Sequence, residues 1–130
     1  MSFTWSTIAQ PADIDELGHV NNTVWVRWIQ DIATAHWRYA ARAEDVDRYV
    51  WVVIRHEIDY LGNVSEGETV TARTWVPDGP RGARFDRWIE FTGPDGKPKV
   101  RAKTTWAMID TTTGRIGRVT PEIAAPFLGG

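Results

Sequence analysis

The chain has 130 residues, 42% of them hydrophobic, which suits one domain with a buried core and is short for two. Its 15 Lys and Arg against 17 Asp and Glu give a formal net charge of −2, which excludes the basic field that holds nucleic acid or an anionic membrane. The absence of cysteine excludes disulfides, thiolate nucleophiles and zinc sites with Cys ligands. We therefore expect a single domain over residues 1–130, with no nucleic-acid or membrane partner.

The opening segment MSFTWSTIAQ lacks the basic and apolar regions of a secretory signal. No apolar run approaches the roughly 20 residues that span a bilayer. These two features predict a cytoplasmic protein.

The first third of the chain reads as a short strand, a loop and a long helix. Residues 3–8 have strand character, and Pro11, Gly18 and two Asn mark residues 9–22 as a loop. From Val24 onward, apolar residues recur at helical spacing over about 20 residues. Asn21 or Asn22 is suited to cap this helix, because its side chain can accept from an unpaired N–H of the first turn.

After residue 49 the hydrophobic period changes from 3.6 to 2, which predicts strands. They span residues 49–61, 68–76, 83–91 and 99–109, and Asp-Gly pairs in the turns PDGPRG and TGPDGK favour tight hairpins. Residues 120–128 are expected to form a short terminal helix with Thr120 as N-cap and Pro121 at its first position.

One strand, one long helix and four meandering strands predict an α+β fold in which an antiparallel sheet wraps around the helix. Alternation gives the sheet an apolar face toward the helix. The residues expected on that face include Val70, Ala72, Thr74, Val76, Val100, Ala102, Thr104, Trp106 and Met108.

The segment before the helix concentrates groups that can perform acid-base chemistry. Residues 13–22, DIDELGHVNN, contain three carboxylates, an imidazole, a glycine and two amides. A helix N-terminus exposes N–H donors and about half a positive charge, which suits an oxygen that becomes negative during acyl transfer. An upstream carboxylate could attack the same carbonyl or activate a water. The alternative interpretation is an ordinary loop and cap, since Asp, Gly and Asn are common in strand-to-helix connections.

The ordered pattern D-x-D-x-x-G-H-V-N-N, followed by the helix start T-V-W-V-R-W, resembles the signature of the hotdog-fold acyl thioesterases. The likeness is to the 4-hydroxybenzoyl-CoA thioesterase-like branch and, around HVNN, to the plant acyl-carrier-protein thioesterases. It is strongest over residues 11–32, and the order of elements, the strand E-I-D-Y-L and Gly67-Glu68 extend it to almost the full chain.

The resemblance implies specific roles for four residues. Asp15 matches the essential carboxylate of the family, as nucleophile or general base toward the thioester. Gly18 would permit close backbone approach, and the amide of Asn22 would polarise the thioester carbonyl. His19 matches a position that is catalytic in the acyl-carrier-protein enzymes but apolar in some coenzyme A enzymes.

Two positions depart from the family pattern. Trp25 replaces the usual Tyr of the first helical turn, where it would contact substrate, and Gln30-Asp31 replaces a frequent acidic pair. The identity of a second carboxylate in the site is therefore open, and Glu57 is retained as a candidate residue near the substrate.

Other polar residues are weaker candidates for a functional role. His36 and His56 are single histidines for which structural roles are favoured. Basic residues on two neighbouring hairpin strands or their turns could hold the phosphates of coenzyme A, or form a solvated sheet face. They are Arg81, Arg84, Lys97, Arg101 and Lys103.

The leading hypothesis is an acyl-CoA thioesterase that needs no metal and no cofactor apart from the coenzyme A of its substrate. An acyl-carrier-protein thioester is the other substrate class. A homodimer or homotetramer with its sites at a subunit boundary is expected, because the resemblance implies it and because a small sheet leaves strand edges to pair. The alternatives are a non-catalytic module that binds an acyl-CoA or a polyketide-like ligand, and a dehydratase or hydratase on the same fold. The eight Trp could form core and interface contacts or line a pocket for an aromatic or medium-chain acyl group.

Overall fold

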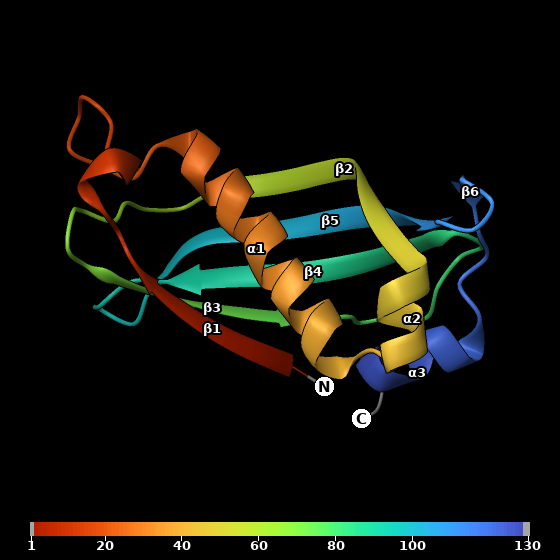
Figure 1. The fold of residues 1–130 in the computed structure, drawn as a ribbon. Helices are drawn as coiled ribbons and strands as arrows, with labels where there is room; N and C mark the ends of the chain where they lie inside the picture. Colours follow the sequence, from red (N-terminus) through yellow and green to blue (C-terminus); the bar gives the residue numbers. More distant parts are fainter. Residues whose placement is uncertain (1, 129–130) are drawn as a thin grey trace.

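One long helix, α1 (Asn22–Ala40), packs against the inner face of a curved antiparallel sheet in the computed structural model, which describes residues 2–128 (Figure 1). Asn21 caps the helix by accepting a hydrogen bond from the N–H of Thr23, so the first of the two Asn predicted as caps is the one used. The residues that α1 buries recur at the predicted helical spacing. They are Val24, Trp25, Trp28, Ile29, Ile32, Ala33 and His36.

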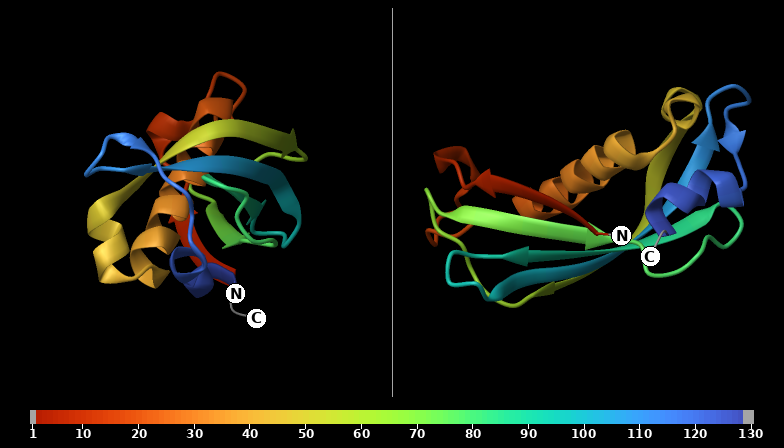
Figure 2. Two further views of the ribbon diagram at one scale, coloured as in Figure 1. Left: turned by 90° about the vertical axis from the view of Figure 1, so that its right-hand side faces the viewer. Right: turned by 90° about the horizontal axis from the view of Figure 1, so that it is seen from below.

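The five long strands form a continuous sheet in the order β1-β3-β4-β5-β2, with all neighbours antiparallel. The views in Figure 2 show the sheet curling around the helix. The strands lie within two residues of their predicted bounds. They are β1 (Ser2–Ile8), β2 (Tyr49–Tyr60), β3 (Thr69–Trp75), β4 (Arg84–Thr92) and β5 (Pro98–Asp110).

Three short elements were not predicted. They are the 3₁₀ turn η1 (Pro11–Asp13), the helix α2 (Ala43–Arg48) and the two-residue strand β6 (Arg115–Ile116), which pairs with β5. Each is too short to show a hydrophobic period in the sequence. The terminal helix α3 (Pro121–Leu128) is present as predicted, and the hydroxyl of Thr120 accepts from the N–H of Ile123 at its start.

Only one of the two predicted Asp-Gly hairpins is tight. Asp95 and Gly96 turn β4 into β5, with Gly96 at a φ of 76° and the N–H of Gly93 bonded to the carbonyl of Lys97. The prediction for the first turn is wrong, because β3 and β4 are joined by a longer connection that turns at Gly82, where φ is 63°. Pro77 and Pro80 flank that Asp-Gly pair and have no N–H to extend a ladder.

The core divides into two clusters along α1. One joins the first half of the helix to β3, β4 and β5, and the other lies under α3 at the opposite end of the sheet. All the residues predicted on the inner sheet face are buried except Trp106, which is half-buried. Within residues 2–128, no helix has both the length and the apolar character needed to span a membrane.

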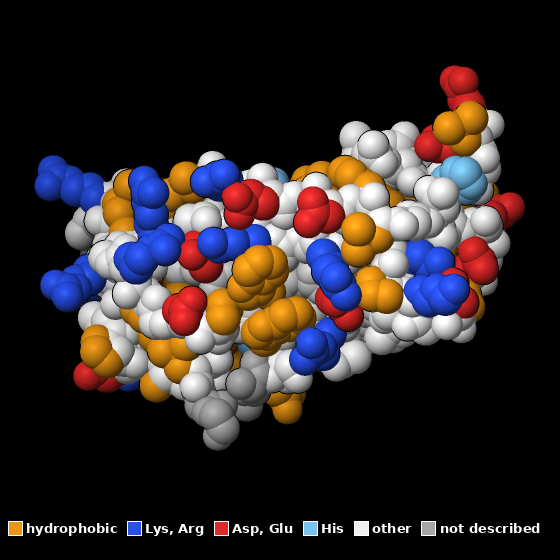
Figure 3. All heavy atoms as spheres, turned by 180° about the vertical axis from the view of Figure 1, so that it is seen from behind, with side chains coloured by type: hydrophobic (Ala, Val, Ile, Leu, Met, Phe, Trp, Pro, Cys, Tyr) orange, Lys and Arg blue, Asp and Glu red, His pale blue; other side chains and the backbone are white. Residues whose placement is uncertain are grey.

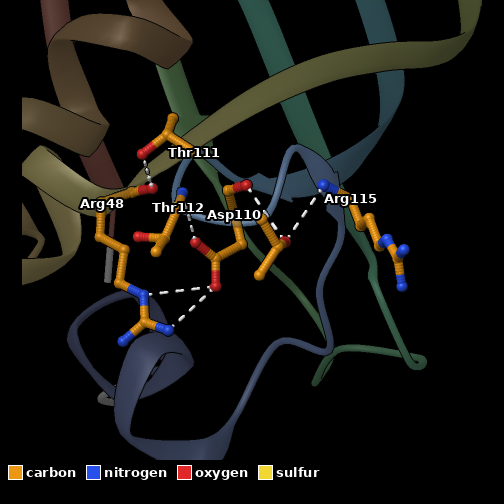
Figure 4. A network of polar contacts seen from close by, with 6 residues as sticks. Arg48, Asp110, Thr111, Thr112 and Arg115 are labelled. Atoms are coloured by element: carbon orange, nitrogen blue, oxygen red, sulfur yellow. Dashed lines mark hydrogen bonds and ion pairs between the residues drawn. The ribbon is translucent and has the colours of Figure 1, made fainter.

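A charged network ties the start of β2 to the end of β5 (Figure 4). The Asp110 carboxylate accepts from Nη2 of Arg48 at 3.0 Å, from Nε of Arg48 at 3.3 Å and from the N–H of Thr112 at 2.9 Å. The hydroxyl of Thr111 donates to the carbonyl of Arg48. The network therefore anchors the α2–β2 junction to β5.

This network predicts a pH dependence of stability. The side-chain hydrogen bonds from Arg48, followed by the Thr112 N–H, hold the pKa of Asp110 below its ordinary value. A carboxyl whose pKa is lowered by folding stabilises the fold above its unfolded pKa of about 3.9 and loses this contribution as pH falls through the folded pKa. We expect the thermal midpoint of Asp110→Asn to fall less steeply than that of wild type between about pH 5 and pH 2. Asp47→Asn, at an exposed position of α2, is the control, and equal slopes for wild type and Asp110→Asn would contradict the prediction.

Candidate active site

The loop between η1 and α1 folds back on itself and stands out from the body of the molecule (Figure 1). Ile14 and Val20 form a β-bridge, the N–H of Asp15 donates to the carbonyl of His19 at 2.8 Å, and the N–H of Gly18 donates to the carbonyl of Asp15 at 3.1 Å. Gly18 has a φ of 81°, a conformation that glycine adopts without strain. A Cβ at Gly18 would meet nothing within 4 Å in this chain, so the backbone conformation and not lack of space requires glycine.

The Asp15 carboxylate is oriented by this loop. Its Oδ1 accepts from the N–H of Leu17 at 2.9 Å and from the N–H of His19 at 3.2 Å. Its Oδ2 has no hydrogen-bond partner among residues 2–128, and the side chain is half-buried. One oxygen is therefore held in place while the other is available to a reactant.

Among the described residues, one N–H in the first turn of α1 has no hydrogen-bond partner. The side-chain oxygen of Asn21 accepts a hydrogen bond from the N–H of Thr23 at 3.0 Å, and its carbonyl oxygen accepts one from the N–H of Val24 at 2.9 Å. In the described part of the chain, the Asn22 N–H makes no hydrogen bond. This donor carries the partial positive charge of the helix end and can stabilise a developing oxyanion.

The carboxylate of Asp13 has a structural role. It is 6% exposed and accepts from the N–H of Gln10 and from Nη2 of Arg27, each at 2.9 Å. The carbonyl of Asp13 also accepts from the N–H of Asn21 at 2.9 Å. These bonds fix the loop against α1 and leave Asp15 and Glu16 as the carboxylates free to act.

The structure places the other predicted residues in different surroundings. His19 is half-buried in the same loop as Asp15, and Asn22 is exposed at the helix start. Trp25 is a core residue, 2% exposed, whose ring packs edge-on against Trp28 and Phe91 with centroids 5.2 Å apart. Glu57 lies on β2 and pairs with Arg55 at 2.8 Å.

The five basic positions do not form one cluster. Arg84 is the first residue of β4, and Arg81 lies just before it. Lys97 lies in the turn beyond the end of β4, so a nine-residue strand of roughly 25–30 Å separates it from the two arginines. Arg101 and Lys103 lie between, on β5. Three of the five pair with carboxylates: Arg81 and Lys103 with Asp86, and Arg101 with Glu90. Figure 3 shows charges of both signs interspersed over the outer face of the sheet.

A cavity of about 290 Å³ lies at the other end of α1, between the helix, α2, α3 and the sheet. Six of its 14 lining residues are aromatic, and three of these are Trp, for which the sequence left the lining of a pocket open as a role. The aromatic residues that line it are Trp37, Tyr49, Trp51, Phe85, Trp106 and Phe127.

Arg87 is the unexpected residue of this cavity. It is 8% exposed, and its Nη1 donates to Nδ1 of His36 at 2.8 Å and to the hydroxyl of Thr74 at 3.0 Å. Because arginine only donates, His36 accepts through Nδ1 and is neutral. Burial, together with the charge of Arg87, lowers the pKa of His36 to about 4. Arg87 was not among the site residues predicted from the sequence, although the alternation Phe85-x-Arg87-x-Ile89 is the signal that could have placed it on the inner face.

The cavity and the Asp15 loop lie at opposite ends of α1. From Asn22 to Ala33, the first cavity residue on the helix, the axis advances about 16 Å. A single chain therefore does not bring the carboxylate to the cavity.

The comparisons with known proteins agree with this architecture. Residues 9–127 match the family model described as the thioesterase-like superfamily. The chain belongs to this superfamily. Over 74 residues it is 26% identical to the chloroplast acyl-[acyl-carrier-protein] hydrolase FATB3 of Cuphea viscosissima, a match that covers 57% of this chain and 18% of that protein. The chain thus spans about a fifth of the length of that curated relative.

Two solved structures show that this thioesterase-like chain has the hotdog fold. A Staphylococcus aureus protein in complex with CoA superposes with a TM-score of 0.85 at 16% identity, over 97% of this chain and 81% of that one. The 1,4-dihydroxy-2-naphthoyl-CoA thioesterase from Synechocystis superposes with a TM-score of 0.82 at 13% identity, over 99% and 97% of the two chains. The resemblance read from the pattern around Asp15 is confirmed at the level of family and fold.

The different surroundings of Asp13 and Glu16 predict different effects on stability. Asp13→Asn breaks the pair with Arg27 and weakens a nearly buried site, and we expect it to lower the free energy of unfolding by about 1–3 kcal/mol. Glu16→Gln changes an exposed side chain and should stay within about 0.5 kcal/mol of wild type. Urea denaturation of both variants measures the difference, and equal midpoints would show that Asp13 does not brace the loop.

Proposed function

We propose that the protein hydrolyses an acyl-CoA thioester to a carboxylic acid and coenzyme A, with Asp15 as the catalytic carboxylate. The observation that carries the proposal is the pairing of two features in one loop. Asp15 has one oxygen held by two N–H groups and one oxygen free, and the unpartnered Asn22 N–H follows at the start of α1. Membership of the thioesterase-like superfamily supports the same chemistry.

The reaction follows from these positions in one of two forms. The free Oδ2 of Asp15 removes a proton from a water whose oxygen attacks the thioester carbon, or it attacks that carbon itself. The carbonyl oxygen becomes negative and accepts from the Asn22 N–H. Collapse breaks the carbon–sulfur bond, and the thiolate leaves and takes up a proton. In the first form the carboxylic acid is then released directly. In the second form the acyl group remains on Asp15 as a mixed anhydride, which a water hydrolyses to release the acid and restore the carboxylate. His19, beside Asp15 in the loop, is proposed to position the attacking group.

A second copy of the chain would complete the site. The outermost strand β2 is long and leaves apolar side chains exposed at Val50, Val52 and Ile54, with exposed fractions between 43% and 49%. Such an edge pairs readily with another chain. We propose a homodimer, or a tetramer of such dimers, in which the β2 edges pair antiparallel about a two-fold axis.

This pairing brings the two halves of the site together. The N–H of Val20 donates to the carbonyl of Val64, so α1 begins near the end of β2, and α2 leads from the end of α1 to the start of β2. Antiparallel pairing then sets the end of one β2, with its Asp15 loop, beside the start of the other. The start of β2, from Tyr49 to Trp51, lines the cavity. The acyl group would thus enter the cavity of one copy while Asp15 of the other faces its carbonyl.

The coenzyme A portion is proposed to contact basic residues outside the cavity. Arg84 is exposed near the cavity end of β4 and makes no ion pair within residues 2–128. Arg81 neighbours it, whereas Lys97, Arg101 and Lys103 are more distant candidates. The structural neighbour solved with CoA supports coenzyme A as the carrier, and the acyl-carrier-protein hydrolase relative keeps a carrier-protein thioester as the second candidate. The cytoplasmic location stays a prediction from the sequence.

Release of thiol distinguishes hydrolysis from simple binding of an acyl-CoA. A panel of acyl-CoAs is mixed with the protein, and free thiol is measured with a thiol-reactive dye. We expect Asp15→Asn to lower kcat by at least about a hundredfold, because a positioned base contributes on the order of 10²–10⁴. The Asn side chain can still accept from the Leu17 and His19 N–H groups, so the fold should survive.

Glu16→Gln is the matched control, because it removes one negative charge from the next position in the same loop. It should retain kcat within about threefold, since Glu16 is exposed and no ligand contact is assigned to it. Equal losses in the two variants would reject Asp15 as the catalytic group. Tight binding of acyl-CoA without any release of thiol would instead favour the non-catalytic module.

The proposed assembly has its own test in sedimentation. At micromolar concentration the wild type should sediment as a dimer or tetramer, and Val52→Lys should shift it to monomer, because a charge would enter the shared sheet edge. Thr112→Lys, in an exposed turn, should sediment like wild type. A wild type that sediments only as monomer would rule out the shared site.

A further inference from the structure

The cavity at the second half of α1 combines aromatic walls with a buried positive charge that has no counterion within residues 2–128. Arg87 lines this cavity and is more than nine-tenths buried. Both hydrogens of its Nη1 are used by neutral acceptors, Nδ1 of His36 and the hydroxyl of Thr74. Its Nε and Nη2 groups have no hydrogen-bond partner within residues 2–128. Three N–H bonds of a charged group are thus left for a ligand.

The surrounding protein does not neutralise this charge. Asp86 is the one acidic residue among those that line the cavity, and its carboxylate is bound to Arg81, to Lys103 and to the hydroxyl of Thr105. Strand alternation places Asp86 on the opposite face of β4 from Arg87. A second cation, Arg38, lies in the last turn of α1 and also lines the cavity.

Two further donors in the cavity wall lack acceptors. The indole Nε1 atoms of Trp51 and Trp106 are buried and unpaired in the described structure, although both residues line the cavity. Buried N–H groups are normally paired, because leaving one unpaired costs as much as a lost hydrogen bond. The wall therefore holds an excess of hydrogen-bond donors and the buried, unpaired charge of Arg87, and a ligand that supplies only hydrocarbon would leave both unsatisfied.

We propose that this cavity receives an acyl group with an aromatic or short apolar body that carries a carboxylate at its far end, and that Arg87 binds this carboxylate through its free N–H groups. The inference rests on the proposed thioesterase function, whose substrate class it names. A planar guanidinium matches a carboxylate in two parallel hydrogen bonds. A volume of 290 Å³, at about 30 Å³ per water-sized group, accommodates on the order of ten non-hydrogen atoms, enough for one ring and a carboxylate.

A direct binding measurement tests the cavity without requiring turnover. The two probes are monomethyl terephthalate and methyl 4-methylbenzoate, which share the ring and a neutral ester and differ by a carboxylate in place of a methyl group. By titration calorimetry, the wild type should bind the carboxylate at least about tenfold more tightly, as expected for a charge-assisted hydrogen bond. Equal affinities, or tighter binding of the neutral ester, would overturn the proposal.

Two variants assign the preference to one side chain. Arg87→Met, close in volume and uncharged, should lose the tenfold preference, and Arg115→Met, an exposed arginine on β6, should keep it. Arg87→Lys keeps the charge without the planar fork and should show a smaller preference of the same sign. If Arg87→Met does not fold, the affinities of Arg87→Lys and of the wild type for the two esters decide whether Arg87 binds the carboxylate. A preference that persists undiminished in Arg87→Met or Arg87→Lys would show that another group binds the carboxylate.

A parallel assay separates this proposal from the hydrolase itself. The thioesters 4-carboxybenzoyl-CoA and 4-methylbenzoyl-CoA are compared by thiol release, and kcat/KM should favour the former in the wild type but not in Arg87→Met. Equal hydrolysis of both thioesters, with equal affinities for the two esters, would reject the carboxylate site and leave the hydrolase intact. Selective binding without thiol release from either thioester would support the cavity and reject the hydrolase.

Discussion

The packing of one face of α1 on the curved sheet positions every candidate functional group. Trp28, Ile29 and Ile32 are almost fully buried against the inner sheet face, and each such side chain contributes about 1.5–3 kcal/mol by leaving water. The helix is therefore a rigid spacer between two candidate sites, one at each end. At its start the pair of Asp13 and Arg27 holds the Asp15 loop, and its second half forms one wall of the aromatic cavity. The length of this spacer explains why the proposed site needs a second copy of the chain.

Arg87 introduces a second constraint, which is electrostatic. Burial lowers the pKa of Arg87 to about 10, so the side chain is still protonated at neutral pH and carries its charge into the core. Burial of an unpaired charge costs several kcal/mol, and the contacts with His36 and Thr74 offset only part of that cost. His36 remains neutral, stacks on Phe3 with ring centroids 5.0 Å apart, and contributes an acceptor without a charge. The expectation of a structural role for His36 agrees with this position, although its partner was not foreseen.

The sequence predicted the fold well wherever hydrophobic periodicity was strong. The long helix, the five long strands and the terminal helix all follow a sustained pattern, and the Asn21 cap follows local hydrogen-bond chemistry. The features that the sequence did not predict are short elements or depend on contacts between distant residues. No local pattern shows that Asp13 pairs with Arg27, fourteen residues away. Nor does a local pattern show that the turn between β3 and β4 lies at Gly82 and not at Asp78-Gly79, which two prolines flank.

The candidate site likewise contains residues that the local sequence indicates and residues that it does not. The loop of Asp15, Gly18 and His19 could be read from the sequence, because its chemistry is local and ordered. Trp25 could not be placed, since an aromatic residue in a first helical turn can face the core or a ligand with the same sequence. Arg87 was within reach, because strand alternation between Phe85 and Ile89 already required a charged side chain on the inner face. In this chain the cation at a core position of an alternating strand lines a cavity, whereas three of the five predicted surface cations pair with carboxylates.

The aromatic walls and the arginine would contribute unequally to substrate selection. A hydrophobic pocket separates ligands that differ by one methylene by only about 10–200-fold, so the rings alone would accept many acyl groups. A buried polar group rejects a ligand that leaves it unpaired far more strongly, because the full desolvation cost then remains. In this cavity the rings of Trp37, Trp51 and Phe85 would set the size of the acyl group, and the unpaired N–H groups of Arg87 would set its charge. Within one chain the Asp15 loop lies at the other end of the helix from this cavity, so substitutions in the cavity are expected to alter selectivity without disturbing the loop of the same chain.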